Sequence, residues 1–184
     1  MSHKEKLDLA AEMGVMSNEA HGALSRNPER WLKLCGIDIE HLTTKGSDVL
    51  PAKVVEILRI YPQAKAQGCR GFFIGGKVNL DMAQHIAGAF LRNLISVRLV
   101  PLSDVINLQT RGELERPTCL IIPDIYEPAT SIAKWEIKDL HAALYGRATS
   151  NYWTIGLTPD LAGCLEAYGQ TFKGITSNWT RVKV

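Results

Sequence analysis

Residues 71–80 read Gly-Phe-Phe-Ile-Gly-Gly-Lys-Val-Asn-Leu, and a run with helical periodicity follows over residues 81–91. An apolar strand that ends in glycines and a lysine, followed by an amphipathic helix, is how phosphate-binding loops begin, because loop amides and a helix N-terminus attract an anion. As letters, residues 71–77 satisfy GxxxxGK, the first half of that motif. The stretch therefore predicts an α/β fold of the nucleotide-binding kind.

The same stretch makes a poor phosphate loop. Residues 72–74 (Phe-Phe-Ile) are the only ones here apolar enough to form the strand, yet the motif would place them inside the loop, where small residues are needed. If they are the strand, only Gly75, Gly76 and Lys77 remain, and the loop is about four residues short of the motif. Val78 stands where a Ser or Thr hydroxyl would bind Mg²⁺, and valine offers no oxygen.

Length and composition set wide bounds. The chain has 184 residues, 46% of them apolar and 22% charged, with a net charge of +2. This length suits one α/β domain with a small appendage, and the proportions are ordinary for a globular protein. No basic run by itself predicts nucleic-acid binding, so DNA contact would need a local patch.

The cysteines predict a reduced environment. They are widely spaced, without a CxxC pair or a histidine at ligand spacing: Cys35, Cys69, Cys119 and Cys164. We expect them to be mostly buried apolar residues of a cytoplasmic protein, and we expect no zinc site. Residues 1–12 lack the apolar core of a secretion signal, and no apolar run is long enough to span a bilayer.

The first 66 residues have the pattern of a small helical region. Asn27 is a candidate cap with Pro28 at the first helical position, residues 46–48 are expected to form a turn, and residues 51–66 one helix. From residue 67 on, strands and helices alternate. Strands are expected at 72–74, 97–100, 119–122, 152–157 and 180–184, and helices at 80–91, 131–145 and 161–172, with a short helix or extended loop at 102–108. Continuous apolar strands in such an alternation predict a parallel sheet of about five strands covered by helices on both faces, a three-layer P-loop NTPase-like fold over residues 67–184.

The ends of the later strands carry polar residues in a recognisable order. The third strand ends in Pro123-Asp124, the next helix ends in Gly146-Arg147, and the fourth strand runs into Thr158. In this succession residues 69–184 resemble the AAA+ P-loop ATPases, and more closely the DnaC/IstB group of helicase loaders and transposition helpers. The resemblance implies a nucleotide site formed by Gly75, Gly76, Lys77, Asp124 and Thr158, with Asp124 as the ligand if Mg²⁺ is bound. It also implies that Arg147 contacts nucleic acid or a neighbouring subunit.

Departures from that family are as informative as the matches. Besides the short loop and Val78, Pro123 and Ile125 stand where the family has acidic residues, which leaves Asp124 alone. No arginine follows at the expected finger position before Arg181. Loss of a positioned arginine alone lowers the phosphoryl-transfer rate on the order of a thousandfold or more. The sequence therefore predicts a degenerate ATPase motif set, and no catalytic residue is assigned.

Three functional hypotheses follow. The favoured one is a non-hydrolysing AAA+/DnaC-like protein that binds a protein partner, DNA or both in replication or transposition, in a phage or mobile element. Its partner would be a replicative helicase or a transposase, docked by residues 1–66, with no cofactor required. The second is an active ATPase that holds ATP and Mg²⁺ through Lys77 and Asp124. The third is a structural subunit that assembles with copies of itself or with an intact ATPase that supplies the nucleotide.

Single residues keep simpler interpretations beside these. Lys77 can be a solvated lysine after a glycine turn, and Asp124 is expected to be a cap or polar contact rather than a metal ligand. Arg147 can be a surface cation at a helix C-terminus. His85 has no recognised partner at ligand spacing and is expected to be a surface or satisfied residue.

Overall fold

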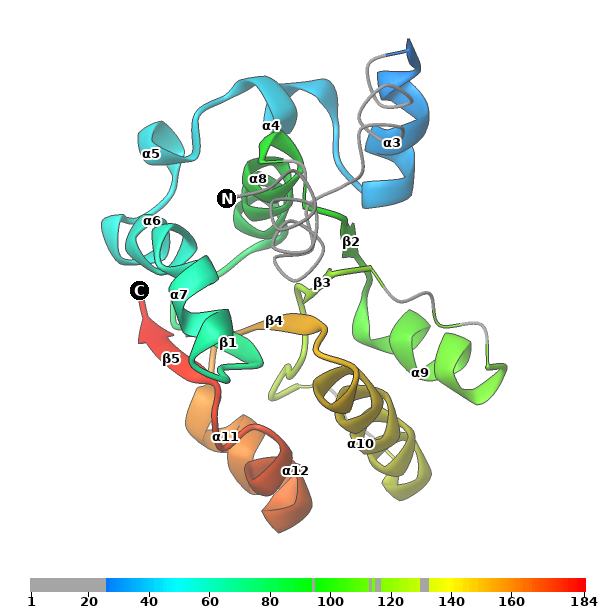
Figure 1. Cartoon of the computed structure of the whole chain (residues 1–184). Coiled ribbons are helices and arrows are strands. Elements are labelled where there is room, and N and C mark those ends of the chain that lie inside the picture. Colours follow the sequence, from blue (N-terminus) through cyan, green and yellow to red (C-terminus); the bar gives the residue numbers. More distant parts are fainter. Residues whose placement is uncertain (1–25, 94, 113, 115–116, 130–132) are drawn as a thin grey trace, which may run out of the picture.

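A computed structural model describes residues 26–93, 95–112, 114, 117–129 and 133–184. Its centre is a five-stranded, wholly parallel sheet in the order β2-β3-β4-β1-β5. The strands are β1 (Gly71–Gly75), β2 (Val97–Leu99), β3 (Cys119–Ile122), β4 (Trp153–Thr158) and β5 (Thr180–Lys183). The fold class predicted from the sequence is confirmed, with a sheet between two layers of helices as in P-loop-like folds (Figure 1).

Five described helices lie before the first strand, and from β1 onward helices and strands alternate. The helices are α3 (Pro28–Cys35), α4 (Ile39–Thr43), α5 (Gly46–Val49), α6 (Ala52–Arg59), α7 (Tyr61–Ala66), α8 (Leu80–Arg92), α9 (Leu102–Thr110), α10 (Lys134–Thr149), α11 (Leu161–Ala167) and α12 (Gly169–Ile175). The start of α3 follows the predicted cap, since Asn27 Oδ1 accepts a hydrogen bond from the Arg30 amide. Within the described ranges, no helix combines the length and the apolar character needed to cross a membrane.

The alternation of side chains along β1 divides the core into two halves. Phe72 and Ile74 point into one cluster with α3 to α8, whereas Phe73 points into the other with α9 to α12. All three are fully buried and lie in a strand paired with β4 on one side and β5 on the other. The sequence-based prediction that residues 72–74 form a buried strand is confirmed. Successive strand residues face opposite helical layers, so all three can be buried only when helices cover both faces of the sheet.

The described part of the N-terminal region packs on the sheet domain. Leu32, Ile57 and Tyr61 share one apolar cluster with Phe72 and Phe90. Tyr61 stacks edge-on against Phe90, with ring centroids 5.0 Å apart. Residues 26–66 thus supply part of the helical layer over one face of the sheet. The division of the chain into a helical region, 1–66, and an α/β domain, 67–184, stays a prediction.

Three local predictions of helix and turn positions were wrong. Residues 51–66 form two helices, α6 and α7, because Pro62 lacks the amide proton that a continuous helix would use. Residues 161–172 are divided at Gly169, whose φ of +76° lies in the left-handed region. Residues 46–48, expected as a turn, belong to the short helix α5.

Candidate functional site

The loop after β1 is short and tightly held. Only residues 76–79 separate β1 from α8. Gly76 has a φ of +109°, and a Cβ at this position would overlap the carbonyl oxygen of Val184, just after β5. Glycine is therefore required here for the close approach of the protein's own backbone rather than for the approach of a phosphate.

The loop amides are occupied inside the protein. The Gly76 amide donates to the Thr158 carbonyl at 3.2 Å and the Lys77 amide to the Val184 carbonyl at 3.4 Å. The Val78 amide donates to the Gly76 carbonyl at 2.9 Å. At the next position, Asn79 Oδ1 accepts from the Met82 amide and caps α8. The amides of residues 76–78, which would hold phosphate in a phosphate-binding loop, are thus used by internal acceptors.

Two loop side chains have opposite environments. Lys77 is exposed, in agreement with either interpretation of this residue. Val78 is half-buried and packs against the apolar cluster over the sheet. The residue that takes the place of the expected hydroxyl therefore contributes to the core.

Asp124 is turned away from the glycine loop. Its Oδ1 accepts a hydrogen bond from the Leu102 amide at 2.8 Å, at the first residue of α9. This helix follows β2, which lies on the side of β3 opposite to β4 and β1. The carboxylate satisfies an otherwise unpaired amide at a helix N-terminus, where negative charge is favoured, and this agrees with the predicted cap.

The hydroxyl of Thr158 is buried and fully engaged. The residue has no exposed surface. Its Oγ1 donates to the Tyr126 carbonyl at 2.8 Å and accepts from the Asp160 amide at 3.1 Å. This side chain holds the loops after β3 and β4 together at the carboxyl end of the sheet.

Arg147 is an interior residue, and its predicted surface position was wrong. It is 3% exposed, and its guanidinium donates to the carbonyls of Pro117 and Trp153 and to Thr154 Oγ1. The Tyr152 ring lies 5.6 Å from its Cζ atom. A guanidinium used in this way joins α10 to the amino ends of β3 and β4, and little of it is exposed for the predicted contact with nucleic acid or a neighbouring subunit.

These residues do not fit a nucleoside triphosphate with Mg²⁺. The loop amides of residues 76–78 already have acceptors, and the Val78 side chain has no oxygen. Asp124 caps α9, which follows β2 on the side of β3 away from β1. The structure brings Gly75, Gly76 and Thr158 together at one end of the sheet, but it joins them by backbone hydrogen bonds.

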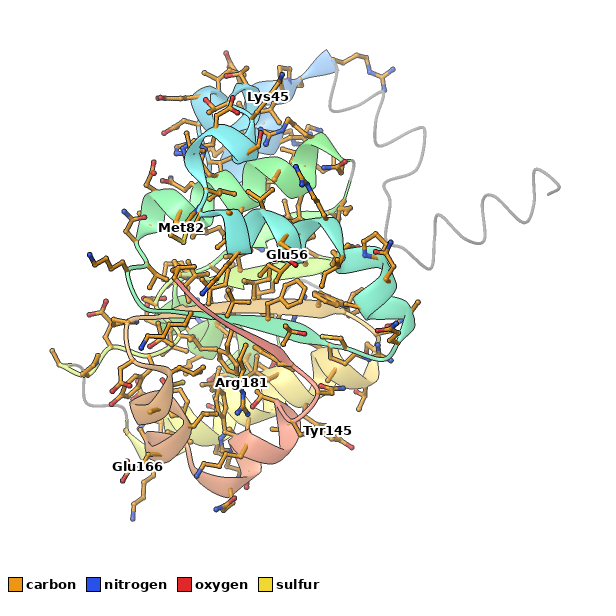
Figure 2. All side chains as sticks on the ribbon, turned by 90° about the vertical axis from the view of Figure 1, so that its left-hand side faces the viewer. Lys45, Glu56, Met82, Tyr145, Glu166 and Arg181 are labelled. Carbon is orange, nitrogen blue, oxygen red and sulfur yellow. The ribbon has the colours of Figure 1, made fainter. Side chains whose placement is uncertain are left out.

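Exposed basic residues gather on the neighbouring edge of the sheet. Lys53 Nζ donates to the Lys183 carbonyl at 3.3 Å, and Lys183 is paired with Gly75 in the sheet. Arg181 lies two residues earlier on β5, on the face seen in Figure 2, where Glu56 of α6 also lies. In the part of the chain that the structure describes, Lys53, Lys77, Arg181 and Lys183 have no carboxylate at ion-pair distance. We call these four residues the basic edge.

Sequence reasoning missed a polar cluster at the other end of the loop. His85 is buried, and its Nε2 lies 3.6 Å from Oδ1 of Asp81, four residues earlier on α8. His41 Nε2, from α4, lies 3.5 Å from the same oxygen. The prediction that His85 lacks a partner at ligand spacing was therefore wrong. The i, i+4 spacing of Asp81 and His85 was a usable signal, whereas His41 is brought in only by the fold.

Comparison with known proteins leaves the family open. No protein-family model matches the chain, and a search of curated proteins also gives no match. The resemblance to AAA+ and DnaC/IstB proteins stays a prediction. Its coarser part, an α/β fold with a five-stranded parallel sheet compatible with a P-loop-like fold, is shown by the structure.

Proposed function

We propose that this protein acts by binding, through protein or DNA contacts, and not by hydrolysis of a nucleotide. The observation that carries the proposal is that the amides of Gly76, Lys77 and Val78 donate to internal carbonyls. Binding of a triphosphate would require those hydrogen bonds to break and the strand end at Val184 to move. The carbonyls that now accept from these amides would lose their donors, and a buried acceptor left unsatisfied costs about 1–3 kcal/mol.

The setting of the proposal is DNA replication or transposition, with a replicative helicase or a transposase as the partner class. Its support is the order of motif residues that resembles the DnaC/IstB group. Residues 1–66 are the proposed docking region for that partner. The third hypothesis, self-assembly, is separated from it by light scattering over a range of protein concentrations.

The basic edge is the proposed surface for DNA. Its four cations lie on the loop after β1, on α6 and on the edge strand β5, so they form a local patch on a chain of low net charge. Phosphate contacts of lysine and arginine supply most non-specific affinity for nucleic acids. A patch of this size predicts weak binding that falls steeply with salt.

Nucleotide binding is tested with a labelled ATP analogue and Mg²⁺, by equilibrium binding to the wild type and to Lys77→Ala. We expect no saturable binding at micromolar concentrations for either protein, because the loop amides are occupied. Micromolar binding that depends on Lys77 would contradict the proposal and favour the ATPase hypothesis with Lys77 and Asp124.

DNA binding is tested by titration of labelled single- and double-stranded DNA at several salt concentrations. The double variant Arg181→Ala/Lys183→Ala should weaken binding and lower the salt slope by about 1 for each lost phosphate contact. Lys134→Ala/Lys138→Ala on α10 is the matched control, because it removes the same charge from exposed positions on a helix outside the basic edge. An equal effect of both double variants would exclude the basic edge as the DNA surface.

A further inference from the structure

Three side chains from two helices converge between α4 and α8. His41 and His85 are 8% and 7% exposed, whereas the carboxylate of Asp81 faces solvent. The two imidazole rings lie with centroids 4.7 Å apart. One ligand atom from each residue, two ring nitrogens and one carboxylate oxygen, lies within 4.8 Å of the others.

The distances in this cluster are long for hydrogen bonds and suit a shared ion. The Nε2 atoms of His41 and His85 lie 3.5 and 3.6 Å from Oδ1 of Asp81. Good hydrogen bonds between nitrogen and oxygen span about 2.7–3.2 Å. Ligands on a tetrahedral metal with bonds of about 2.0–2.1 Å lie roughly 3.3 Å from one another, close to the observed separations.

The cluster also contains a polar atom without a partner. Among the described residues, the buried Nδ1 of His85 has no hydrogen-bond partner. The long contact between His85 Nε2 and Asp81 compensates little for this unsatisfied Nδ1. A buried polar atom without a partner calls for an explanation. A metal at Nε2 would leave the ring proton on Nδ1 without an acceptor, so this atom does not by itself point to an ion, and the case for an ion rests on the ligand distances.

We propose that His41, Asp81 and His85 form a site for a divalent metal ion of the zinc type. Two imidazoles and one carboxylate are ligands of borderline character, which zinc accepts, and the exposed side of Asp81 leaves a path for the ion and a position for water. The ion would clamp α4 of the N-terminal region onto α8. The site uses none of the loop amides and does not depend on the function proposed above.

One hydrogen bond must be given up on binding. His41 Nδ1 accepts from the Asp38 amide at 3.3 Å, so the neutral ring carries its proton on Nε2, facing Asp81. A metal at Nε2 moves that proton to Nδ1 and removes the bond to Asp38. The Asp38 amide and the Nδ1 proton would then be two donors facing each other, so this segment must shift slightly, a cost that the free energy of metal ligation has to exceed.

Three of the four cysteines, Cys35, Cys119 and Cys164, are buried as thiols. Burial raises the pKa of the Cys35 thiol to about 11 and that of the Cys119 and Cys164 thiols to about 12, so none of them is a thiolate near neutral pH. The ligand atoms of the cluster are two nitrogens and one oxygen. A cobalt complex of the site should therefore lack thiolate-to-metal charge-transfer absorption.

The test is a titration of the full chain, purified without metal, with Co²⁺ and then Zn²⁺. We expect one equivalent of Co²⁺ to bind with visible d–d absorption, and Zn²⁺ to displace it. Asp81→Asn should weaken binding at least roughly tenfold, since loss of even an outer-shell group has about that effect. An excess of Zn²⁺ should raise the thermal unfolding midpoint of the wild type more than that of Asp81→Asn.

Two further variants make the result specific. His85→Gln should weaken binding as Asp81→Asn does, and Asp81→Asn decides the question if His85→Gln does not fold, because position 81 is exposed. His3→Gln/His21→Gln is the control, since it removes two imidazoles outside the described residues. The inference is overturned if the wild type binds no Co²⁺ saturably, if Asp81→Asn binds it equally well, or if the control variant abolishes binding.

Discussion

Two polar regions at the start of α8 differ in how completely their groups are satisfied. In the glycine loop before the helix, the amides of Gly76, Lys77 and Val78 all have carbonyl acceptors. In the first turn of the helix, Asp81 lies near two buried histidines at long distances. The glycine loop, where the sequence predicts a ligand, thus has its amides bonded to the protein's own backbone. The histidine cluster, where the sequence predicts none, contains the ligand atoms of the proposed metal site. A motif shows which groups a chain carries, but only their partners show whether those groups are free.

The largest expected effect on stability comes from a substitution in the glycine loop. Gly76→Ala should lower the free energy of unfolding by about 3 kcal/mol or more, because the φ of +109° is strained for alanine and the Cβ would overlap the Val184 carbonyl. Urea denaturation measures this change. Gly68→Ala is the matched control, with a φ of +86° and no atom near the added Cβ. It should cost about 1–2 kcal/mol from backbone strain alone. Equal losses would mean that Val184 does not close the loop.

Contact between the two helices of the histidine cluster gives an intermediate effect. A Cβ on Gly88 of α8 would overlap the His41 carbonyl oxygen, which also accepts a hydrogen bond from Arg92. Gly88→Ala should therefore cost about 2 kcal/mol by overpacking, although alanine favours a helix by about 1 kcal/mol. Gly146→Ala in α10, where the added Cβ meets no atom, should instead stabilise the protein by about 0.5–1 kcal/mol. Thermal or urea unfolding of both variants tests the prediction. Stabilisation by Gly88→Ala would show that α4 does not pack closely on α8.

The role of Asp124 gives the smallest effect. Asp124→Ala should cost about 1 kcal/mol of stability, because the Leu102 amide at the start of α9 loses its acceptor. Asp124→Asn keeps an acceptor oxygen and should cost only a few tenths of that amount, roughly 0.3 kcal/mol. Urea unfolding distinguishes the two. Equal losses in both variants would argue that the charge, and not the acceptor, matters at this position.

Much of the fold was predictable because it depends on local patterns. The third strand was placed at its observed bounds, 119–122, since four consecutive apolar residues next to a proline leave little freedom. Asn27 and Pro28 marked the start of α3 for an equally local reason. The division of residues 161–172 was missed because it depends on the left-handed backbone at Gly169, and glycine also occurs within helices.

The site residues were less predictable because their roles depend on distant partners. Arg147 reads as a surface cation at the end of a helix, yet the strand ends that it contacts bury it. The resemblance placed Thr158 in a nucleotide site, but its hydroxyl donates a hydrogen bond to the carbonyl of Tyr126, 32 residues earlier. His41 and His85 are 44 positions apart and meet only because α4 crosses α8.

By itself the sequence determined the parallel sheet, the buried strand at residues 72–74 and the lack of a hydroxyl at Val78, since apolar periodicity and residue chemistry are properties of short segments. Only the tertiary structure decided that Val184 and Thr158 fill the loop amides and that His41 joins Asp81 and His85. Hydrogen bonds and ligand sets form between segments that are far apart in the chain, and their distances are fixed only when the core has packed.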